Sequence, residues 1–254
     1  METADRQDRI LDQLRRSGKV RATPLAAQLG VTVQTIRRDL RELSDAGRIE
    51  RIHGGAVLPS GVRNIGYDDR RSVNRDAKQR IGEATARLIP DNASLFLNIG
   101  TTTEAVARAL ARHRNLMVVT NNLNVAMILA THPSCDVVVA GGNLRRADGG
   151  LVGDLAALAI TRFRVDIAVL GTSAIDPGGD LLDFDPEEVR VSQQVLAAAR
   201  SAITVADASK FTRKAPVRVG SLADVGHLVT DSPPPAALAQ RLQNWAVRTV
   251  IARP

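Results

Sequence analysis

Residues 20–58 have the sequence VRATPLAAQLGVTVQTIRRDLRELSDAGRIERIHGGAVL, and this stretch decides the fold of the first part of the chain. A helix is expected just before it, over residues 6–16, because apolar residues recur there on one face. Ser17 and Gly18 then end that helix.

Capping and turn residues predict two further helices inside the stretch. Thr23 is the expected N-cap of the second helix, with Pro24 at the first helical position. Gly30 permits a tight turn, and Thr32 is the expected N-cap of the third helix, which Gly47 ends. One buried stripe of the third helix is formed by Val33, Ile36, Leu40 and Leu43.

The other faces of this third helix carry side chains that suit DNA. Gln and Arg pair with base edges through two hydrogen bonds, and Thr and Arg hold phosphates. Because the start of such a helix enters the groove most deeply, Gln34, Thr35 and Arg38 are expected at the bases. Asp39 is expected to pair with a neighbouring arginine instead. The helix residues expected at the DNA are Thr32, Gln34, Thr35, Arg37 and Arg38.

A two-stranded wing is expected after the third helix. Residues 48–53 alternate apolar and polar, two glycines turn the chain, and residues 56–58 return. Arg51 and His53 lie where they could reach phosphate or the minor groove. The joint occurrence of caps, turn and wing predicts a winged helix-turn-helix that binds double-stranded operator DNA. The plainer alternative is a three-helix surface domain with a solvated basic face.

Length and charge agree with a DNA-binding part followed by a second domain. The chain has 254 residues, for which two domains are the natural expectation. The first 90 residues carry 18 Lys and Arg against 12 Asp and Glu, whereas the remainder is almost balanced. The basic excess therefore lies with the part that is expected to meet phosphate.

Cysteine usage and hydropathy predict a soluble, cytoplasmic protein. Cys135 stands alone, which excludes a disulfide framework. The charged start METADRQDR is unlike a secretory leader, and no apolar run of about 18 residues suits a membrane span.

The rest of the chain predicts a linker and an α/β domain. We expect the winged helix-turn-helix over 1–58, a linker without helical period over 59–75, and the α/β domain over 76–254. Expected helices lie near 77–88, 104–111, 124–131, 154–162 and 187–200. Expected strands are 95–99, 116–120, 136–140, 166–170, 202–206 and 226–230. This alternation is typical of a mainly parallel sheet.

Polar residues and glycines follow the expected strands. Ligands of open parallel sheets bind at the carboxyl ends of the strands, and Gly100–Thr103 opens a helix there, which suits an anion. Asn121, Asn122 and Asp148 could bind hydroxyls, and Lys210 could neutralise phosphate charge. These ends together predict a small phosphorylated, hydroxyl-rich ligand, although each one alone is also typical of a cap or turn.

Several motifs resemble those of the DeoR family of bacterial transcriptional regulators over nearly the whole chain. The first part contributes VTVQTIRRDLREL and RIHGGAV. The second contributes GTTTEAVA at 100–107, VVTNNLNVA at 118–126, AGGNLR at 140–145, DGGLVG at 148–153, GDLLDFDPEEVR at 179–190 and DASKF at 207–211. Asn98 departs from the pattern, because the family often has Asp at that position.

The resemblance implies a homo-oligomeric repressor, a dimer or tetramer, of carbohydrate or glycerol metabolism genes. It implies a C-terminal fold similar to sugar-phosphate isomerases and CoA transferases, and release from the operator by a phosphorylated metabolite. TNNLNVA and LLDFD favour the branch that responds to sn-glycerol 3-phosphate. The residues expected around the effector are Gly100, Thr101, Thr102, Thr103, Asn121, Asn122, Gly141, Gly142, Asp148, Glu188 and Lys210.

Two alternatives remain beside this hypothesis. The first is the same repressor with another sugar phosphate as effector. The second is an isomerase or acyl-CoA transferase with an attached DNA-binding domain, in which Glu187, Glu188, Asp207 and Lys210 would serve as acids and bases. No histidine or cysteine nucleophile stands at a strand end, so we expect no catalytic residue; metal ligands and cofactors are not expected either.

Overall fold

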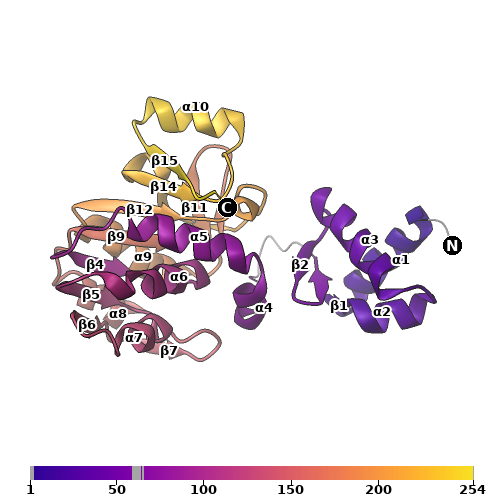
Figure 1. Cartoon of the computed structure of the whole chain (residues 1–254), viewed down its shortest axis with the longest axis horizontal. Coiled ribbons are helices and arrows are strands. Elements are labelled where there is room, and N and C mark those ends of the chain that lie inside the picture. Colours follow the sequence, from indigo (N-terminus) through magenta and orange to yellow (C-terminus); the bar gives the residue numbers. More distant parts are fainter. Residues whose placement is uncertain (1–2, 59–63, 65, 254) are drawn as a thin grey trace. The chain divides into compact units, whose positions relative to one another are not determined.

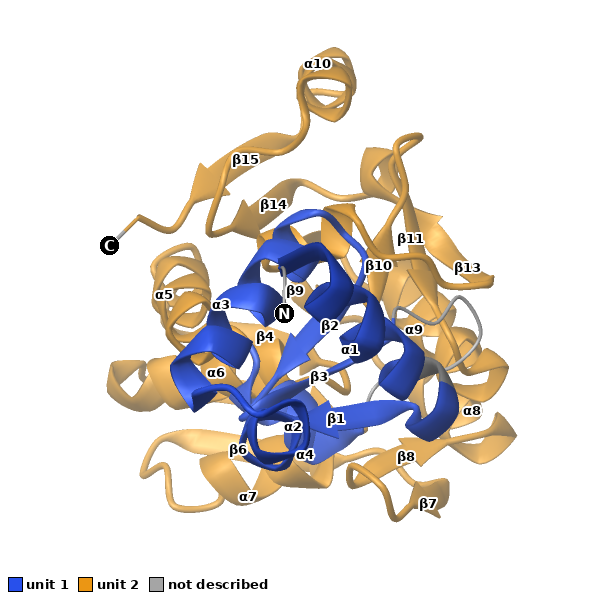
Figure 2. Cartoon of the chain, turned by 90° about the vertical axis from the view of Figure 1, so that its right-hand side faces the viewer, with its two compact units in different colours: residues 1–73 blue, residues 74–254 orange. Residues whose placement is uncertain are grey.

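The computed structural model describes residues 3–58, 64 and 66–253 (Figure 1). The chain forms two compact units, residues 1–73 and 74–254 (Figure 2). The linker expected over 59–75 therefore spans the division, and its residues 59–63 and 65 lie outside the described part.

The first unit is a small helical domain with a three-stranded sheet. Its elements are α1 (Thr3–Ser17), β1 (Lys19–Arg21), α2 (Ala22–Leu29), α3 (Val33–Asp45), β2 (Glu50–Ile52), β3 (Gly55–Val57) and α4 (Tyr67–Ser72). The sheet is antiparallel in the order β1-β3-β2. The core joins α1, α2, α3 and the sheet through Ile10, Leu14, Leu25, Ile36, Leu40, Leu43 and Ala56.

Two of the three expected helix-end residues around α2 and α3 act as predicted. Gly30 ends α2 with a left-handed backbone, φ 65°, and Thr32 caps α3 by accepting a hydrogen bond from the amide of Thr35 at 3.1 Å. The expected cap at Thr23 is wrong. Helix α2 begins at Ala22, whose amide donates to the carbonyl of Gly54 at 2.7 Å.

The wing is confirmed as β2 and β3, and β1 adds a third strand to it. Val20 of β1 lies opposite Ala56 of β3, which places the wing against the helices. Gly55 packs so closely on β1 that an added Cβ would lie 1.9 Å from the carbonyl oxygen of Val20. A side chain at residue 55 would therefore force the two strands apart.

Helix α4 lies in the segment where the sequence predicted no helical period. It packs with the first unit through a salt bridge between Lys19 Nζ and Asp69 Oδ2 at 2.6 Å. At the end of the helix, the Val73 amide donates to the carbonyl of Asp69. Residues 67–72 are thus ordered as part of the first unit.

The second unit is built on a seven-stranded, fully parallel sheet in the order β15-β14-β12-β9-β4-β5-β6. Its strands are β4 (Ser94–Leu97), β5 (Leu116–Thr120), β6 (Cys135–Val139), β9 (Ile167–Gly171), β12 (Ser201–Val205), β14 (His227–Thr230) and β15 (Arg248–Ile251). Its helices are α5 (Arg75–Ala86), α6 (Thr101–Ala109), α7 (Leu123–Leu129), α8 (Asp154–Ile160), α9 (Pro186–Ala198) and α10 (Ala236–Asn244).

Helices cover both faces of this sheet, in three layers (Figure 1). Leu95 and Leu97 of β4 point into the core formed with α5, α6 and α7, whereas Phe96 points into the core formed with α8, α9 and α10. This alternation explains the continuous apolar runs of the strands, because parallel strands are buried on both faces. The expected α/β class is confirmed.

Several short strands escaped the sequence prediction. The pair β7 (Asn143–Arg145) and β8 (Gly150–Val152) forms an antiparallel hairpin, and β10 (Ala174–Ile175), β11 (Asp180–Asp183) and β13 (Val217–Ser221) form a second small sheet. Strand β15 extends the main sheet beyond the last strand that was expected. None of the described helices is long and apolar enough to cross a membrane.

Candidate functional site

Helix α3 presents one buried face and one exposed polar face. Ile36, Leu40 and Leu43 are at most 2% exposed, as the apolar stripe predicted, and Val33 packs at the margin of the same core. Solvent reaches the side chains on the opposite face, namely Gln34, Arg37, Arg38 and Arg41. The buried stripe thus fixes which residues α3 offers to a partner.

The first turn of α3 is preorganised. Thr32 and Thr35 lie with their hydroxyl oxygens 2.9 Å apart, and Thr35 is half-buried. Arg38 lies one turn later, where its Nε donates to Glu42 Oε1 at 3.0 Å on the exposed surface. An exposed pair of this kind is weak, so Arg38 can exchange Glu42 for a phosphate or a base edge.

Asp39 is directed into the domain and away from the exposed face. It accepts two hydrogen bonds from Arg6 of α1, from Nε at 2.5 Å and from Nη2 at 2.9 Å. Asp39 pairs with an arginine as expected, but the expectation of a neighbouring arginine is wrong, because its partner Arg6 lies 33 residues earlier in the chain.

The two wing residues predicted at the DNA are both exposed. Arg51 lies in β2, and His53 lies in the turn that leads to β3. The first unit therefore offers a helix face and a wing to a partner, and none of the residues predicted at the DNA is buried.

In the second unit, the strand order reverses between β4 and β9. The chain passes from β4 outward to β5 and β6, and then returns to the other side of β4 with β9. Such a switch point is where open parallel sheets bind ligands. Asn98, just after β4, bridges the two strands by accepting from the Gly171 amide at 2.9 Å and donating to its carbonyl at 3.3 Å.

The loop Gly100–Thr103 leads from β4 into α6. Gly100 has φ 158°, and α6 begins at Thr101, so the amides at its start have no acceptor within the helix. The hydroxyl of Thr103 lies 2.8 Å from the carbonyl oxygens of both Asn98 and Gly100. Thr103 therefore braces the loop, which leaves Thr101 and Thr102 as the hydroxyls that a ligand could use.

Two buried asparagines follow β5. Asn121 Nδ2 donates to the carbonyl of Leu151 at 3.0 Å, and Asn122 Oδ1 caps α7 by accepting from the amide of Asn124 at 2.9 Å. Within the described part of the chain, Oδ1 of Asn121 and Nδ2 of Asn122 have no hydrogen-bond partner. One unfilled acceptor and one unfilled donor suit a hydroxyl group or a water molecule.

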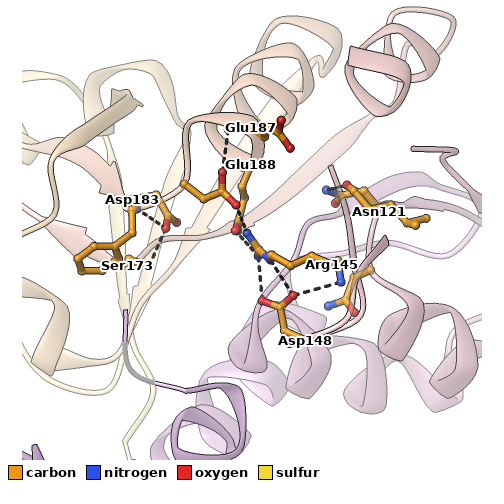
Figure 3. A network of polar contacts seen from close by, with 12 residues as sticks. Asn121, Arg145, Asp148, Ser173, Asp183, Glu187 and Glu188 are labelled. Carbon is orange, nitrogen blue, oxygen red and sulfur yellow. Dashed lines mark hydrogen bonds and ion pairs between the residues drawn. The ribbon is translucent and has the colours of Figure 1, made fainter. Parts of the chain in front are cut away.

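Arg145 of β7 binds three carboxylates (Figure 3). Its Nε and Nη2 donate to Asp148 at 2.9 and 2.8 Å, its Nη1 donates to Asp185 at 2.5 Å, and its Nη2 also reaches Glu188 at 2.5 Å. Burial opposes the charge of Arg145, but Asp148 and Glu188 raise its pKa above the ordinary value. Glu187, which precedes Glu188 in α9, points away from the cluster (Figure 3).

This cluster brings together Asp148 and Glu188, which the sequence placed at the effector, with Arg145 and Asp185, which it did not. Arg145 lies inside the AGGNLR motif, but nothing in its local sequence distinguishes it from the other arginines. Its partners come from the turn after β7 and from the start of α9, 40 and 43 residues later. Sequence spacing carries no signal for such a meeting.

Other groups at the same edge are held by hydrogen bonds. Glu104 of α6 accepts from Asn124 at 3.3 Å, and Asn124 donates to the Asp148 carbonyl at 2.8 Å. Ser173, which follows β9, donates to Asp183 at 3.0 Å. These contacts tie α6, α7 and the β7–β8 hairpin into one framework.

The expected glycines after β6 differ in their roles. At Gly142 the backbone has φ 134°, and an added Cβ would lie 2.8 Å from both the Val152 oxygen and the Ala156 Cβ. Gly142 is therefore required for packing of the hairpin. Gly141 is exposed and has open space around it.

The carboxyl end of β12 carries the last expected effector residue. Asp207 follows the strand and is 1% exposed, and Lys210 lies in the short helix η2 (Ala208–Phe211). Lys210 helps to lower the pKa of Asp207, against the effect of burial. No group of His, Cys, Asp and Glu side chains in the described residues is arranged to hold a metal ion.

Comparison with protein families decides the assignment. The DeoR-like helix-turn-helix domain matches residues 6–62, and the DeoR C terminal sensor domain matches residues 73–232. The chain belongs to the DeoR family. The expected two-domain fold class is confirmed by these matches: a DNA-binding helix-turn-helix precedes an α/β sensor domain.

Several DeoR relatives match this member over nearly its whole length. The glycerol-3-phosphate regulon repressor of Haemophilus influenzae is 46% identical over 92% of this chain and 91% of its own. The repressor of the same name from Escherichia coli is 43% identical over 98% of each chain. The Escherichia coli transcriptional repressor CsqR is 41% identical over 97% of this chain and 94% of its own.

Solved structures with a similar arrangement are more distant. Ribose 5-phosphate isomerase A from Neisseria gonorrhoeae is 15% identical, with a TM-score of 0.39, and covers 54% of this DeoR chain and 53% of its own. The Pyrococcus horikoshii translation initiation factor eIF-2B is 12% identical, with a TM-score of 0.47, over 78% of this chain and 68% of its own.

Proposed function

We propose that this protein is a transcriptional repressor of carbohydrate or glycerol metabolism genes, released from its operator by a phosphorylated metabolite. The observation that carries the proposal is the exposed Gln-Thr-Arg face of α3, held by a buried apolar stripe in a DeoR helix-turn-helix. The names of the relatives support sn-glycerol 3-phosphate as the effector. Because operator DNA is its partner, we place its activity in the cytoplasm.

At the DNA, Gln34, Thr35 and Arg38 would contact bases, and Thr32 and Arg37 would contact phosphates. Arg51 and His53 of the wing would reach the backbone or the minor groove. A homo-oligomer, a dimer or tetramer, would present two such modules. Two-fold-related modules predict inverted half-sites about 10 base pairs apart, or a multiple of that spacing.

At the effector site, charge decides the orientation of the ligand. Arg145 supplies one positive charge against the three carboxylates of Asp148, Asp185 and Glu188, so this end of the site repels phosphate and accepts hydroxyl donors. The start of α6 offers amides, hydroxyls and the positive end of a helix dipole. We therefore place the phosphate at Gly100–Thr103, with Lys210 as the cation that shares its charge, and the polyol end toward Asn121 and Asp148.

Release follows from linkage. The oligomer has one arrangement whose two DNA-binding modules fit the operator and one in which their spacing does not fit. The effector binds the second arrangement more tightly, and the loss of operator affinity equals the difference between its affinities for the two arrangements. We propose no catalytic step, because Glu188 binds Arg145 and Asp207 accepts hydrogen bonds from Asn74 and Ser209, so neither is free to act as an acid or base.

The test is operator binding by fluorescence anisotropy, with DNA from upstream of the protein's own gene. Tight binding that is lost with sn-glycerol 3-phosphate, but not with glycerol, supports both the repressor and the effector. Tight binding that ignores this compound contradicts the effector, and a panel of ketose and hexose phosphates then identifies another. Turnover of any of these compounds by the purified protein would contradict the non-catalytic role.

A further inference from the structure

Asn74, the first residue of the second unit, has an unusual backbone and a distant partner. Its φ is 53°, and it precedes α5 without capping that helix through its side chain. Instead, Nδ2 of Asn74 donates to Oδ1 of Asp207 at 2.8 Å, across 133 residues of sequence. Its carbonyl oxygen accepts from the amide of Lys78 at 2.9 Å, so the position of Asn74 sets the start of α5.

Asp207 joins this contact to the effector edge of the sheet. The same Oδ1 accepts from the amide of Ser209 at 3.1 Å and from its hydroxyl at 2.5 Å, which organises η2 with Lys210. Burial disfavours the charge of Asp207, and Lys210 and Lys78 compensate it. One buried oxygen therefore receives donors both from the start of α5 and from the segment that carries Lys210.

Asn74 also lies next to the junction with the DNA-binding unit. Val73 separates it from Ser72, the last residue of α4, and α4 is tied to β1 by the Lys19–Asp69 salt bridge. A shift of Asn74 thus acts on the chain segment that enters the first unit.

We propose that Asn74 is the positioning residue that transmits effector binding from Lys210, through Asp207, to the DNA-binding unit. This inference rests on the proposed function of the site. When an effector phosphate shares the charge of Lys210, Asp207 loses part of its compensation. It then depends more strongly on the Asn74 donor, and the start of α5 is held more tightly.

The positive φ of Asn74 does not by itself explain its hydrogen bond to Asp207. Asn92 and Asn115 also have positive φ, 60° and 53°, because asparagine tolerates this region. Asn115 Nδ2 donates to Asn92 Oδ1 at 2.9 Å beside the start of β5, at the opposite edge of the sheet. Asn115 is therefore a control with the same φ that also loses a side-chain amide donor, although to a neutral, exposed acceptor and remote from the effector edge.

The experiment compares Asn74→Gly with Asn115→Gly, because glycine accepts the backbone angle and removes only the side chain. Operator affinity is measured by anisotropy with and without saturating sn-glycerol 3-phosphate, and the ratio is the coupling factor. We expect about tenfold or more for the native protein and for Asn115→Gly, and less than about twofold for Asn74→Gly. Operator affinity without effector should stay within about twofold of native in both variants.

A second variant guards against a folding artefact. Asn74→Asp keeps the shape and the backbone tolerance but places a carboxylate against Asp207, and it should lose the coupling as well. Coupling retained in Asn74→Gly and Asn74→Asp overturns the inference and leaves the proposed function intact. Equal loss in Asn115→Gly also overturns it. A native protein that ignores sn-glycerol 3-phosphate overturns the proposed effector together with the inference.

Discussion

Arg6 of α1 and Asp39 of α3 form a buried, bidentate ion pair. The two hydrogen bonds measure 2.5 and 2.9 Å, and the two residues are 8% and 1% exposed. The pair fixes α3 by its buried side, and its orientation leaves the neighbouring Arg38 directed outward. This pair therefore adds to the apolar core that holds α3 with its DNA-binding face outward.

Removal of one member of this pair should destabilise the first unit strongly. For Asp39→Ala we expect a loss of about 3–5 kcal/mol in free energy of unfolding, because the buried Arg6 loses the Asp39 carboxylate. Amide hydrogen exchange of α1 and α3 measures this loss. The fluorescence of Trp245, which lies in the second unit, should keep its unfolding midpoint. The double variant Arg6→Met, Asp39→Leu should recover most of the stability, and failure to recover would mean that the charges themselves are required.

Loss of Arg38 should weaken operator binding without affecting the sensor domain. For Arg38→Ala we expect about 5- to 150-fold weaker binding, the range for a specific base contact, with unchanged affinity for sn-glycerol 3-phosphate. Arg87→Ala removes the same charge from an exposed position in the second unit and serves as the control. Equal weakening of operator binding in both variants would show that Arg38 contributes only its charge and no specific contact.

The Thr102 hydroxyl should bind the effector phosphate, whereas the adjacent Thr103 hydroxyl is engaged by the carbonyls of Asn98 and Gly100. Thr102→Ala should weaken sn-glycerol 3-phosphate binding by about 10- to 150-fold, the range for a hydrogen bond to a charged group, and leave operator binding intact. Calorimetric titration measures the first effect and anisotropy the second. Thr161→Ala, at the exposed end of α8, should change neither. Native effector affinity in Thr102→Ala would exclude its hydroxyl from the phosphate site.

Arg145 should stabilise the second unit because it neutralises the carboxylates of the hairpin and α9. For Arg145→Ala we expect a loss of about 2–3 kcal/mol, less than for a fully buried pair because its side chain is 22% exposed. Urea unfolding followed by Trp245 fluorescence measures it. Arg145→Lys should recover part of the loss. Equal stability of the native protein, Arg145→Ala and Arg145→Lys would show that solvent already screens the charges of the cluster.

Acid should remove the contribution of Asp207 to stability. Its native pKa is lowered, so this contribution is complete above the ordinary Asp value of about 3.9 and is lost as the pH falls through the lower native value. The difference in free energy of unfolding between the native protein and Asp207→Asn should therefore shrink between about pH 5 and pH 3. A difference that stays constant over this range would contradict the assignment.

Elements with a strong local pattern were predictable from the sequence. The six expected strands of the second unit all occur, and α3 has the expected cap and buried stripe, because alternation and capping act over a few residues. Strand β1 was not predictable, since three residues have no period and its strand conformation comes from pairing with β3. The same pairing moved the start of α2 from the expected cap at Thr23 to Ala22.

The candidate site was predictable only in part, for a related reason. Strand ends and glycines revealed Gly100–Thr103, Asn121 and Asp148, because topology places strand ends at one edge. Arg145, Asp185 and the Asn74–Asp207 contact depend on where distant segments meet. The bracing role of the Thr103 hydroxyl also required the loop geometry.

The tight packing of Gly55 on Val20 has a consequence for how such regulators diverge. Residue 55 cannot change without forcing the wing away from the helices, whereas His53, two residues earlier, is exposed and contributes nothing to the core. Gln34 and Arg38 are equally free of the core. Substitutions at these exposed positions can therefore accumulate during evolution without loss of the fold, so that a descendant of this protein can acquire a new operator while it keeps the same scaffold.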